Sequence, residues 1–415
     1  MKQRLVVIGN GMAGMRTVEE LLTAAPDKYD ITVFGAEPYG NYNRIMLSSV
    51  LCGEKTIEDI VINNRQWYSD NGITLHAGED KAVVRIDRKN KTVHAQDGTV
   101  AGYDRLLIAT GSKAVIPSVP GNDLEGVISF RDIVDVNKML AYSRSHRKAV
   151  VLGGGLLGLE AANGLVSRGM DVTVIHSNEI LLNRQMDRAA AKMLQTELEW
   201  RGLKFKMAAK LKQLLGDDNG HVASVCFDDG SRLECDLFVT AIGVRPNMAL
   251  AQQAGIYCER GIVVNDTLQS YDPSIYAVGE CIQHRGATFG LVAPLFEQAK
   301  VCANHLSAHG AAEYITLPTA TKLKVTGINL FSVGDFQGDK DCASIHFTDP
   351  ALGIYKKLVI KADRLIGAVL YGDTADGNWY QELLETEDSI DGIRDALIFG
   401  KVYCNYSAHK EMGHG

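Results

Sequence analysis

A glycine-rich turn near the amino terminus restricts the folds open to this chain more than any other stretch. Residues 5–8 form an apolar run that is typical of a buried parallel strand, and Gly9, Gly11 and Gly14 follow it. In this spacing the first glycine permits a tight turn, the second lets the backbone approach a pyrophosphate, and the third lets the next helix pack closely on the sheet. A helix over about residues 12–25 would offer its amino-terminal N–H groups to the phosphates. The turn therefore predicts an adenine dinucleotide site.

The residues that follow this turn support the same interpretation. A second strand is expected over 31–34, and it ends near Glu37, where an acidic side chain can accept hydrogen bonds from ribose hydroxyls. The loop that starts at Glu37 carries Arg44 as a lone cation. We favour contact of Arg44 with a diphosphate or an adenine over an ordinary surface position.

A second copy of the pattern lies about 144 residues further along the chain. The apolar residues 149–152 precede Gly153, Gly155 and Gly158, and another strand is expected over 172–175. Two independent copies are hard to obtain by chance, so we expect two dinucleotides to bind. The natural assignment gives the first site to a tightly held FAD and the second to an exchanging nicotinamide coenzyme, NADH or NADPH.

The residue after the strand at 172–175 bears on the choice between the two coenzymes. An acidic residue there would favour NADH and a basic cluster would favour NADPH, whereas His176 decides neither. NADH is favoured because Arg184 is the first arginine downstream. On the helix after the second turn, Glu160 has two open interpretations, a place at the junction of flavin and nicotinamide or a solvated helix carboxylate.

Composition excludes several functional classes. With 415 residues the chain can form two or three domains, and 46% hydrophobic and 22% charged residues are typical of a soluble globular protein. The net charge of -7, without clusters of Lys and Arg, argues against nucleic acid as the main partner. No apolar run approaches the length that spans a bilayer, and no signal peptide precedes the first strand. We therefore expect a cytoplasmic protein that does not act at a membrane.

The eight cysteines are scattered, with no two closer than nine residues apart. This spacing excludes a local C-x-x-C pair and a compact iron–sulfur or zinc site, and we expect no metal.

Three further stretches combine a buried strand with a small-residue turn. They are residues 107–112 with Ala109, Thr110 and Gly111, residues 238–247 with Gly243, and residues 275–281 with Gly279 and Glu280. Together with the two glycine turns, these signatures resemble the glutathione-reductase-like superfamily of FAD-dependent pyridine nucleotide-disulfide oxidoreductases, in the branch that holds ferredoxin and rubredoxin reductases. Residues 41–44, 322–327 and 373–380, and Glu280 in place of the commoner aspartate, are similar to the flavin domain of assimilatory NAD(P)H nitrite reductase large subunits or to electron-transfer subunits of nitrate reductases.

The resemblance implies an α/β fold with two Rossmann-like dinucleotide-binding domains and a C-terminal α+β domain. The implied FAD-binding domain combines residues 1–112 and 240–316, the NAD(P)H-binding domain spans 113–239, the α+β domain spans 317–400, and 401–415 form a tail.

Hydrophobic patterning adds local expectations. Residues 72–100 are expected to form a short antiparallel excursion with a turn at Asp97-Gly98. In the α+β domain, four antiparallel strands are expected near 323–325, 343–347, 355–360 and 365–370. A helix that carries the acidic run from Glu382 to Asp395 should follow them, and the aromatic residues of 371–380 should fill a core.

The resemblance also implies roles for single residues. Glu280 would accept a hydrogen bond from a ribityl hydroxyl, and Glu297 and Gln298 would contact the isoalloxazine from a helix that begins near residue 291. Ser49 follows Leu47-Ser48 where peroxidase-like relatives carry a reactive cysteine and ferredoxin reductases often carry lysine, so no thiol relay is expected. The residues expected to contact the two cofactors are Gly9, Gly11, Met12, Ala13, Gly14, Glu37, Arg44, Ser48, Ala109, Thr110, Gly111, Gly153, Gly155, Leu156, Leu157, Gly158, Glu160, His176, Gly243, Gly279, Glu280, Glu297 and Gln298.

The implied function consists of two half-reactions. Hydride passes from the nicotinamide to the flavin, and electrons then pass singly to a redox protein, a nitrate or nitrite reductase component. No side chain except Glu160 is a candidate for a catalytic role. The chain lacks the cysteine-rich cluster and sirohaem domains of the large subunits, so on its own it should not reduce nitrite. The alternatives are a rubredoxin or ferredoxin reductase, a flavin-based redox sensor, and an oxidase that would depend on Cys52.

Overall fold

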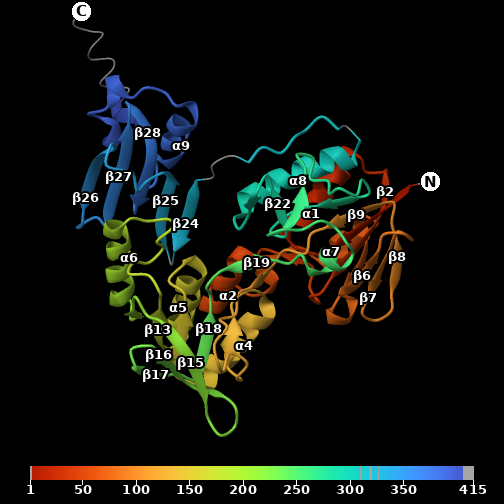
Figure 1. Ribbon diagram of the computed structural model, residues 1–415, viewed down its shortest axis with the longest axis horizontal. Coiled ribbons are helices and arrows are strands. Elements are labelled where there is room, and N and C mark those ends of the chain that lie inside the picture. Colours follow the sequence, from red (N-terminus) through yellow and green to blue (C-terminus); the bar gives the residue numbers. More distant parts are fainter. Residues whose placement is uncertain (1, 309, 317–319, 326, 405–415) are drawn as a thin grey trace, which may run out of the picture. The chain divides into compact units, whose positions relative to one another are not determined.

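The computed structural model describes residues 2–308, 310–316, 320–325 and 327–404, and the chain divides into two compact units (Figure 1). The first unit comprises Met1–Val115, Arg131–Ile133 and Gly243–Leu317, and the second comprises Ile116–Phe130, Val134–Ile242 and Pro318–Gly415. Each unit is therefore assembled from stretches that are far apart in the sequence. Among the described helices, none combines the length and the apolar composition that a membrane span needs.

A five-stranded parallel sheet forms the centre of the first unit. In spatial order its strands are β21 (Ile275–Ala277), β9 (Arg105–Ile108), β1 (Gln3–Ile8), β2 (Tyr29–Gly35) and β5 (Thr74–Ala77). Helix α1 (Met12–Ala24) connects β1 to β2, as the glycine pattern predicts. Because every pairing in this sheet is parallel, the carboxyl ends of β1, β9 and β21 meet at one edge. Three of the signature stretches are thereby brought together.

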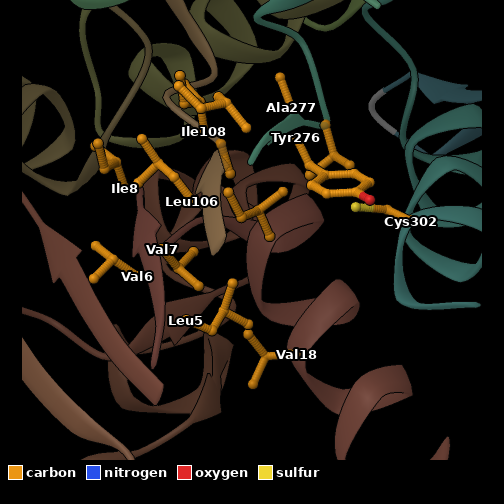
Figure 2. Packing of buried hydrophobic residues seen from close by; sticks show 14 of the residues in the cluster. Leu5, Val6, Val7, Ile8, Val18, Leu106, Ile108, Tyr276, Ala277 and Cys302 are labelled. Carbon is orange, nitrogen blue, oxygen red and sulfur yellow. The ribbon is translucent and has the colours of Figure 1, made fainter. Parts of the chain in front are cut away.

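Side chains from these three neighbouring strands fill the core of the first unit (Figure 2). Leu5 and Val7 of β1 are fully buried and share the cluster with Leu106 of β9. Figure 2 shows the Tyr276 ring of β21 next to Cys302 of α8 (Val292–Leu306), a helix that packs against α1. Full burial of one aliphatic side chain contributes about 1.5–3 kcal/mol, so this core holds the strand ends from which the turns project.

One expectation for the first unit was wrong. Residues 72–100 do not form a single antiparallel excursion, because β5 adds to the parallel sheet beside β2. The antiparallel sheet is confined to β6 (Val83–Asp87), β7 (Thr92–Ala95) and β8 (Val100–Gly102). A four-residue strand has too short an alternation for its pairing partner to be inferred from sequence.

The remaining elements of the first unit are short. They are β3 (Asn41–Tyr42), α2 (Leu47–Cys52), β4 (Val61–Asn63), α3 (Arg65–Asp70), β10 (Ser112–Ala114), β19 (Val244–Pro246), α7 (Ala249–Gln253), β20 (Ile262–Val264), β22 (Ile282–His284) and β23 (Ala287–Thr288). The antiparallel pair β10–β19 joins the stretch after β9 to the stretch that begins at Gly243.

The second unit repeats the parallel design around the second glycine turn. Its sheet runs in the order β11 (Val127–Ser129), β18 (Leu237–Thr240), β12 (Lys148–Leu152), β13 (Asp171–Ile175) and β14 (Lys204–Lys206). Helix α5 (Leu156–Ser167) connects β12 to β13, while α4 (Ile133–Ser145) precedes β12 and α6 (Arg188–Trp200) precedes β14. An antiparallel sheet of β15 (Leu211–Gly216), β16 (Val222–Phe227) and β17 (Arg232–Glu234) shares a core with β12 and β18.

The carboxy-terminal part of the second unit is an antiparallel sheet with one helix. Its strands are β24 (Thr321–Val325), β25 (Ile328–Gly334), β28 (Arg364–Tyr371), β27 (Ile354–Lys361) and β26 (Ala343–Asp349), in spatial order. Strand β25 is additional to the four that were expected. Tyr380 of α9 (Gly377–Thr386) is fully buried in the core of this part, as expected of the aromatic stretch.

The expected acidic helix was wrong in extent. Helix α9 ends at Thr386, because Glu387 adopts a left-handed conformation with φ of 54°. The helix therefore carries only Glu382 and Glu385 of the acidic run, and Asp391 begins a separate 3-10 turn. Of the expected tail, residues 401–404 are helical and 405–415 lie outside the described residues.

The second face of the carboxy-terminal sheet is also covered. Tyr355 of β27 and Tyr371 of β28 are paired in register and buried, on the face opposite to α9. Asp187, the residue before α6, accepts a hydrogen bond from the Tyr355 hydroxyl (2.6 Å), and its side chain also caps α6 by accepting from the Ala190 N–H (3.0 Å). The ammonium of Lys357 lies 3.8 Å from the same carboxylate. One buried carboxylate thus ties this sheet to α6.

We expect Asp187→Ala to lower the free energy of unfolding by about 2–3 kcal/mol, because it removes a helix cap and leaves the buried Tyr355 hydroxyl without an acceptor. Tyr355→Phe removes one hydrogen bond and should cost about 1 kcal/mol. Urea unfolding followed by circular dichroism measures both. The exposed Tyr257→Phe is the matched control, and a Tyr355→Phe variant as stable as that control would contradict the assignment.

Candidate dinucleotide-binding sites

The first glycine turn is shaped by contacts that exclude side chains at two of its three glycines. Gly9 has a φ of +113°, and a Cβ there would collide with the carbonyl of Ala109 at the end of β9. At Gly14, a Cβ would lie 2.8 Å from the Ala109 Cβ and 3.0 Å from the Gly9 carbonyl oxygen. A Cβ added at Gly11 would meet no other part of the described structure within 4 Å. The outer glycines thus serve packing, whereas the middle one leaves open space over the backbone.

The second turn has the same three properties. Gly153 has a φ of +126° and meets the carbonyl of Ala241, which follows β18, and a Cβ at Gly158 would collide with the Gly153 carbonyl. A Cβ added at Gly155 would likewise meet no other part of the described structure within 4 Å. The two turns share no residues, so each one supports the predicted geometry independently.

Both helices that follow these turns begin without a side-chain cap. Gly11 and Gly155 occupy the N-cap positions of α1 and α5, and neither helix has an acidic residue in its first turn. Met12 and Leu156 are the first helical residues, followed by Ala13 and Leu157. The N–H groups of these first turns, together with the helix dipoles, fit the phosphates of a dinucleotide.

Glu37 is part of a compact network in the first unit. Its carboxylate accepts a hydrogen bond from the Tyr42 hydroxyl (2.6 Å) and forms an ion pair with Arg44. The Arg44 guanidinium lies over the Tyr42 ring at 4.8 Å from its centroid. Burial raises the pKa of Tyr42, so this hydroxyl stays protonated and continues to donate. The expectation of Arg44 as a lone cation was therefore wrong, since the neighbouring carboxylate neutralises it.

Glu280 has two partners that the sequence does not bring near it. Its side chain is 14% exposed, accepts from the Ser112 hydroxyl (2.8 Å) and forms an ion pair with Arg131. Arg44 in turn donates to the backbone carbonyl of Arg131 (3.2 Å). Arg131 thus links the carboxylates of Glu37 and Glu280, which are the expected ribose and ribityl acceptors.

Sequence reasoning missed Arg131 and Ser112. The only local signal is that Arg131 stands just after β11 and the buried Phe130, at the point where the chain briefly returns to the first unit. No spacing rule connects it to Glu280, which lies 149 residues away.

The remaining first-site candidates differ in their surroundings. Gln298 is fully buried and accepts from the Gly279 N–H (2.9 Å), so it fastens α8 to the turn after β21. Glu297 is exposed and paired with Lys300. Ser48 lies in α2, where its hydroxyl donates to the Ile45 carbonyl (3.4 Å). We retain all three as predicted contacts.

Thr110 and Gly111 tie the end of β9 to the stretch after β19. The Thr110 hydroxyl donates to the Asn247 carbonyl (2.6 Å), and the Asn247 N–H donates to the Gly111 carbonyl (2.9 Å). Nearby, the Gly243 carbonyl accepts from the Val115 N–H (3.0 Å). These bonds give the signature turns a structural role within the first unit.

The second-site candidates lie on α5 and after β13. Glu160 is a partly exposed residue in the second turn of α5, and its place at a flavin junction stays a prediction. His176 is turned inward, and its Nδ1 accepts from the Gly154 N–H (3.1 Å). Burial lowers the pKa of His176, so the imidazole is neutral near pH 7. Within the described residues, no group of three or more His, Cys, Asp or Glu side chains is arranged to hold a metal ion.

Comparison with known families assigns most of this chain. The family described as pyridine nucleotide-disulphide oxidoreductase matches residues 3–305. The chain belongs to this family. The rubredoxin NAD+ reductase C-terminal domain matches residues 319–388, which contain the carboxy-terminal sheet and α9. Both matches confirm the family and the fold class that the signatures predict.

Two curated relatives share nearly half of their aligned residues with this family member. Over 389 residues this chain is 47% identical to "Nitrite reductase [NAD(P)H]" of Bacillus subtilis (strain 168), and the match covers 94% of this chain and 48% of the relative. Over 400 residues it is 45% identical to "Assimilatory nitrate reductase electron transfer subunit" of the same organism, with 96% and 51% covered. The chain spans about half the length of these relatives.

A solved structure is similar over its whole length. The crystal structure of NADH:rubredoxin oxidoreductase from Clostridium acetobutylicum has a TM-score of 0.78 and 26% identity, and the match covers 95% of this chain and 97% of that one. Membership of an oxidoreductase family and this similarity support an enzyme that uses a flavin and a nicotinamide.

We expect Gly11→Ala and Gly155→Ala to separate the two sites. Both backbones are extended (φ of -91° and -86°) and open, so alanine fits, and each change should cost about 1 kcal/mol of stability at most. Gly11→Ala should weaken flavin retention about tenfold or more, because the methyl group occupies the space that the pyrophosphate needs. The Gly155→Ala variant should retain its flavin, but NAD(P)H should no longer reduce that flavin.

Flavin absorbance per protein and the rate of its bleaching by NAD(P)H measure these outcomes. Gly14→Ala is the steric control, and it should fold poorly because its Cβ meets Ala109. Equal flavin content in wild type and Gly11→Ala would refute the assignment of the first turn.

Proposed function

We propose that this chain is an FAD-dependent NAD(P)H oxidoreductase that passes electrons from a nicotinamide coenzyme, through FAD, to a redox protein acceptor in assimilatory nitrate or nitrite reduction. The observation that carries this proposal is the pair of glycine turns with matching geometry, closed at Gly9 and Gly153 and open at Gly11 and Gly155. One turn lies in each unit, so each of two dinucleotides has a turn of its own.

In the first unit, the chain offers complementary groups for three parts of FAD. The α1 N–H groups would hold the pyrophosphate, Glu37 a ribose, and Glu280 a ribityl hydroxyl. FAD, when bound, would accept a hydride and release electrons one at a time. The protein contributes orientation, because Arg131 and Ser112 already hold Glu280 and Arg44 holds Glu37.

In the second unit, the α5 N–H groups would bind the pyrophosphate of the nicotinamide coenzyme. The imidazole of His176, which is neutral near pH 7, follows β13 beside this turn. Glu160 is the one side chain we retain as a candidate at the reacting end.

The proposed acceptor is a redox centre of a nitrate or nitrite reductase, and the proposed location is the cytoplasm. The support for this acceptor comes from the names of the two Bacillus subtilis relatives at 47% and 45% identity. The part of the chain that the structure describes holds no cluster of metal-ligating side chains. We therefore propose that the acceptor centre belongs to another polypeptide or domain.

A second candidate is a rubredoxin reductase. Two observations favour it, the rubredoxin NAD+ reductase C-terminal domain at 319–388 and the end-to-end similarity to a NADH:rubredoxin oxidoreductase. The two candidates share the hydride-transfer half-reaction and differ in the acceptor.

We expect anaerobic rapid mixing of the flavin-loaded protein with NADH or NADPH to bleach the oxidised flavin absorbance within seconds, at a typical turnover of about 1–1000 per second. The reduced protein is then mixed with rubredoxin or with the cluster and haem portion of a nitrite reductase. Reoxidation by the nitrite reductase portion should be the faster by about tenfold or more. Faster reoxidation by rubredoxin would support the second candidate, and absence of bleaching by either coenzyme would overturn both.

A further inference from the structure

His176 stands at the position that decides which coenzyme a dinucleotide fold accepts. It directly follows β13, where such folds place a side chain that meets the adenosine ribose. Its backbone is held on both sides, since the His176 N–H donates to the Lys206 carbonyl (3.1 Å) and its carbonyl accepts from the Ala209 N–H (2.8 Å). The side chain therefore projects from a fixed point.

The imidazole lies against the glycine turn. Its Nδ1 accepts from the Gly154 N–H (3.1 Å), and a Cβ at residue 154 would lie 2.8 Å from both the Cγ and the Cδ2 of the ring. Only glycine at 154 permits this contact. Gly154 also accepts from the Leu182 N–H (3.0 Å) through its carbonyl, so the turn that receives the ring is itself anchored.

This hydrogen bond defines the charge of the side chain. An Nδ1 that accepts from an N–H group carries no proton, so the neutral ring carries its proton on Nε2. Protonation of Nδ1 would place two donors against each other. The atom Nε2 is buried and makes no hydrogen bond of good geometry within the described residues. Burial lowers the pKa of His176, and the nearby Asn183 side chain opposes part of that effect.

Two charged side chains near this position have ion-pair partners of their own. Glu179 is paired with Arg188 (2.6 Å), and Lys206 is paired with Asp229 (3.1 Å). The residue directly after β13 is thus neither a carboxylate that would repel a 2′-phosphate nor a guanidinium that would attract one.

We propose that His176 makes the second site accept NADH and NADPH with little discrimination, an inference that rests on the proposed function of that site. The ring accepts the Gly154 N–H and carries no charge that would exclude a 2′-phosphate. This replaces the expectation of NADH, which depended on the absence of nearby arginines rather than on the geometry of His176.

The test compares ADP-ribose with 2′-phospho-ADP-ribose, which differ only in the 2′-phosphate and carry no nicotinamide. Calorimetric titration of the flavin-loaded protein should give two dissociation constants within about tenfold of each other, whereas a site that pairs with or repels the phosphate discriminates by about 100-fold or more. A ratio above 100 in wild type would overturn the inference.

Two variants separate charge from shape. His176→Asp keeps an acceptor for the Gly154 N–H and adds a negative charge. It should therefore weaken the binding of 2′-phospho-ADP-ribose, relative to that of ADP-ribose, by about 30-fold or more. His176→Asn keeps an acceptor without a charge. The ratio of its dissociation constants for the two compounds should stay within about threefold of the wild-type ratio. A His176→Asp ratio equal to that of wild type would also overturn the inference.

The same titration distinguishes the inference from the proposed function. If neither compound binds to wild type, the second site is misassigned and both proposals fall. If both bind with similar affinity while NADH and NADPH leave the flavin oxidised, the electron-transfer function fails and the assignment of His176 stands.

Discussion

A backbone contact that only glycine permits underlies both of the proposed nucleotide sites. In each unit a backbone carbonyl occupies the place that a Cβ on the first glycine of the turn would need. This carbonyl belongs to the residue just after a neighbouring parallel strand, Ala109 in one unit and Ala241 in the other. A side chain there would push the strand away and move the helix that follows. The contact thereby sets the position of the amino-terminal N–H groups of α1 and α5, which are the groups that a pyrophosphate needs. The fold and the proposed binding sites therefore depend on the same few atoms.

The carboxylates of the first unit are held before any ligand arrives. Glu37 is fixed by Tyr42 and Arg44, and Glu280 by Ser112 and Arg131. Partly buried ion pairs add little net stability, because the desolvation of the charges offsets most of their attraction. Their value lies in orientation, since acceptors that are already in place lose less entropy when a ligand binds. Arg131 joins the two pairs through its side chain and its backbone carbonyl.

The parts of the structure that were predictable from sequence are those that depend on local pattern. The two glycine turns, the strands beside them and the family signatures need only spacing and apolar runs, and they were correct. Ion-pair partners were not predictable, because no rule places Arg131 beside Glu280, which lies 149 residues away, and spacing alone does not show that Arg44 pairs with Glu37. Short elements failed for a related reason. Strand β5 has too few residues to reveal its partner, and the left-handed Glu387 ends α9 within a run of acidic residues that a helix tolerates.

The carboxy-terminal sheet illustrates how a single polar group can determine packing that hydrophobicity alone leaves open. Both of its faces are apolar enough to be buried, and α9 covers only one. The second face could pack on any apolar surface, since the hydrophobic effect has no direction. Asp187 adds direction, because its carboxylate caps α6 and also accepts the hydrogen bond of the Tyr355 hydroxyl in the observed placement of the sheet. The buried Tyr355 hydroxyl would cost about 1–3 kcal/mol without that acceptor, enough to disfavour a shifted register of sheet on helix.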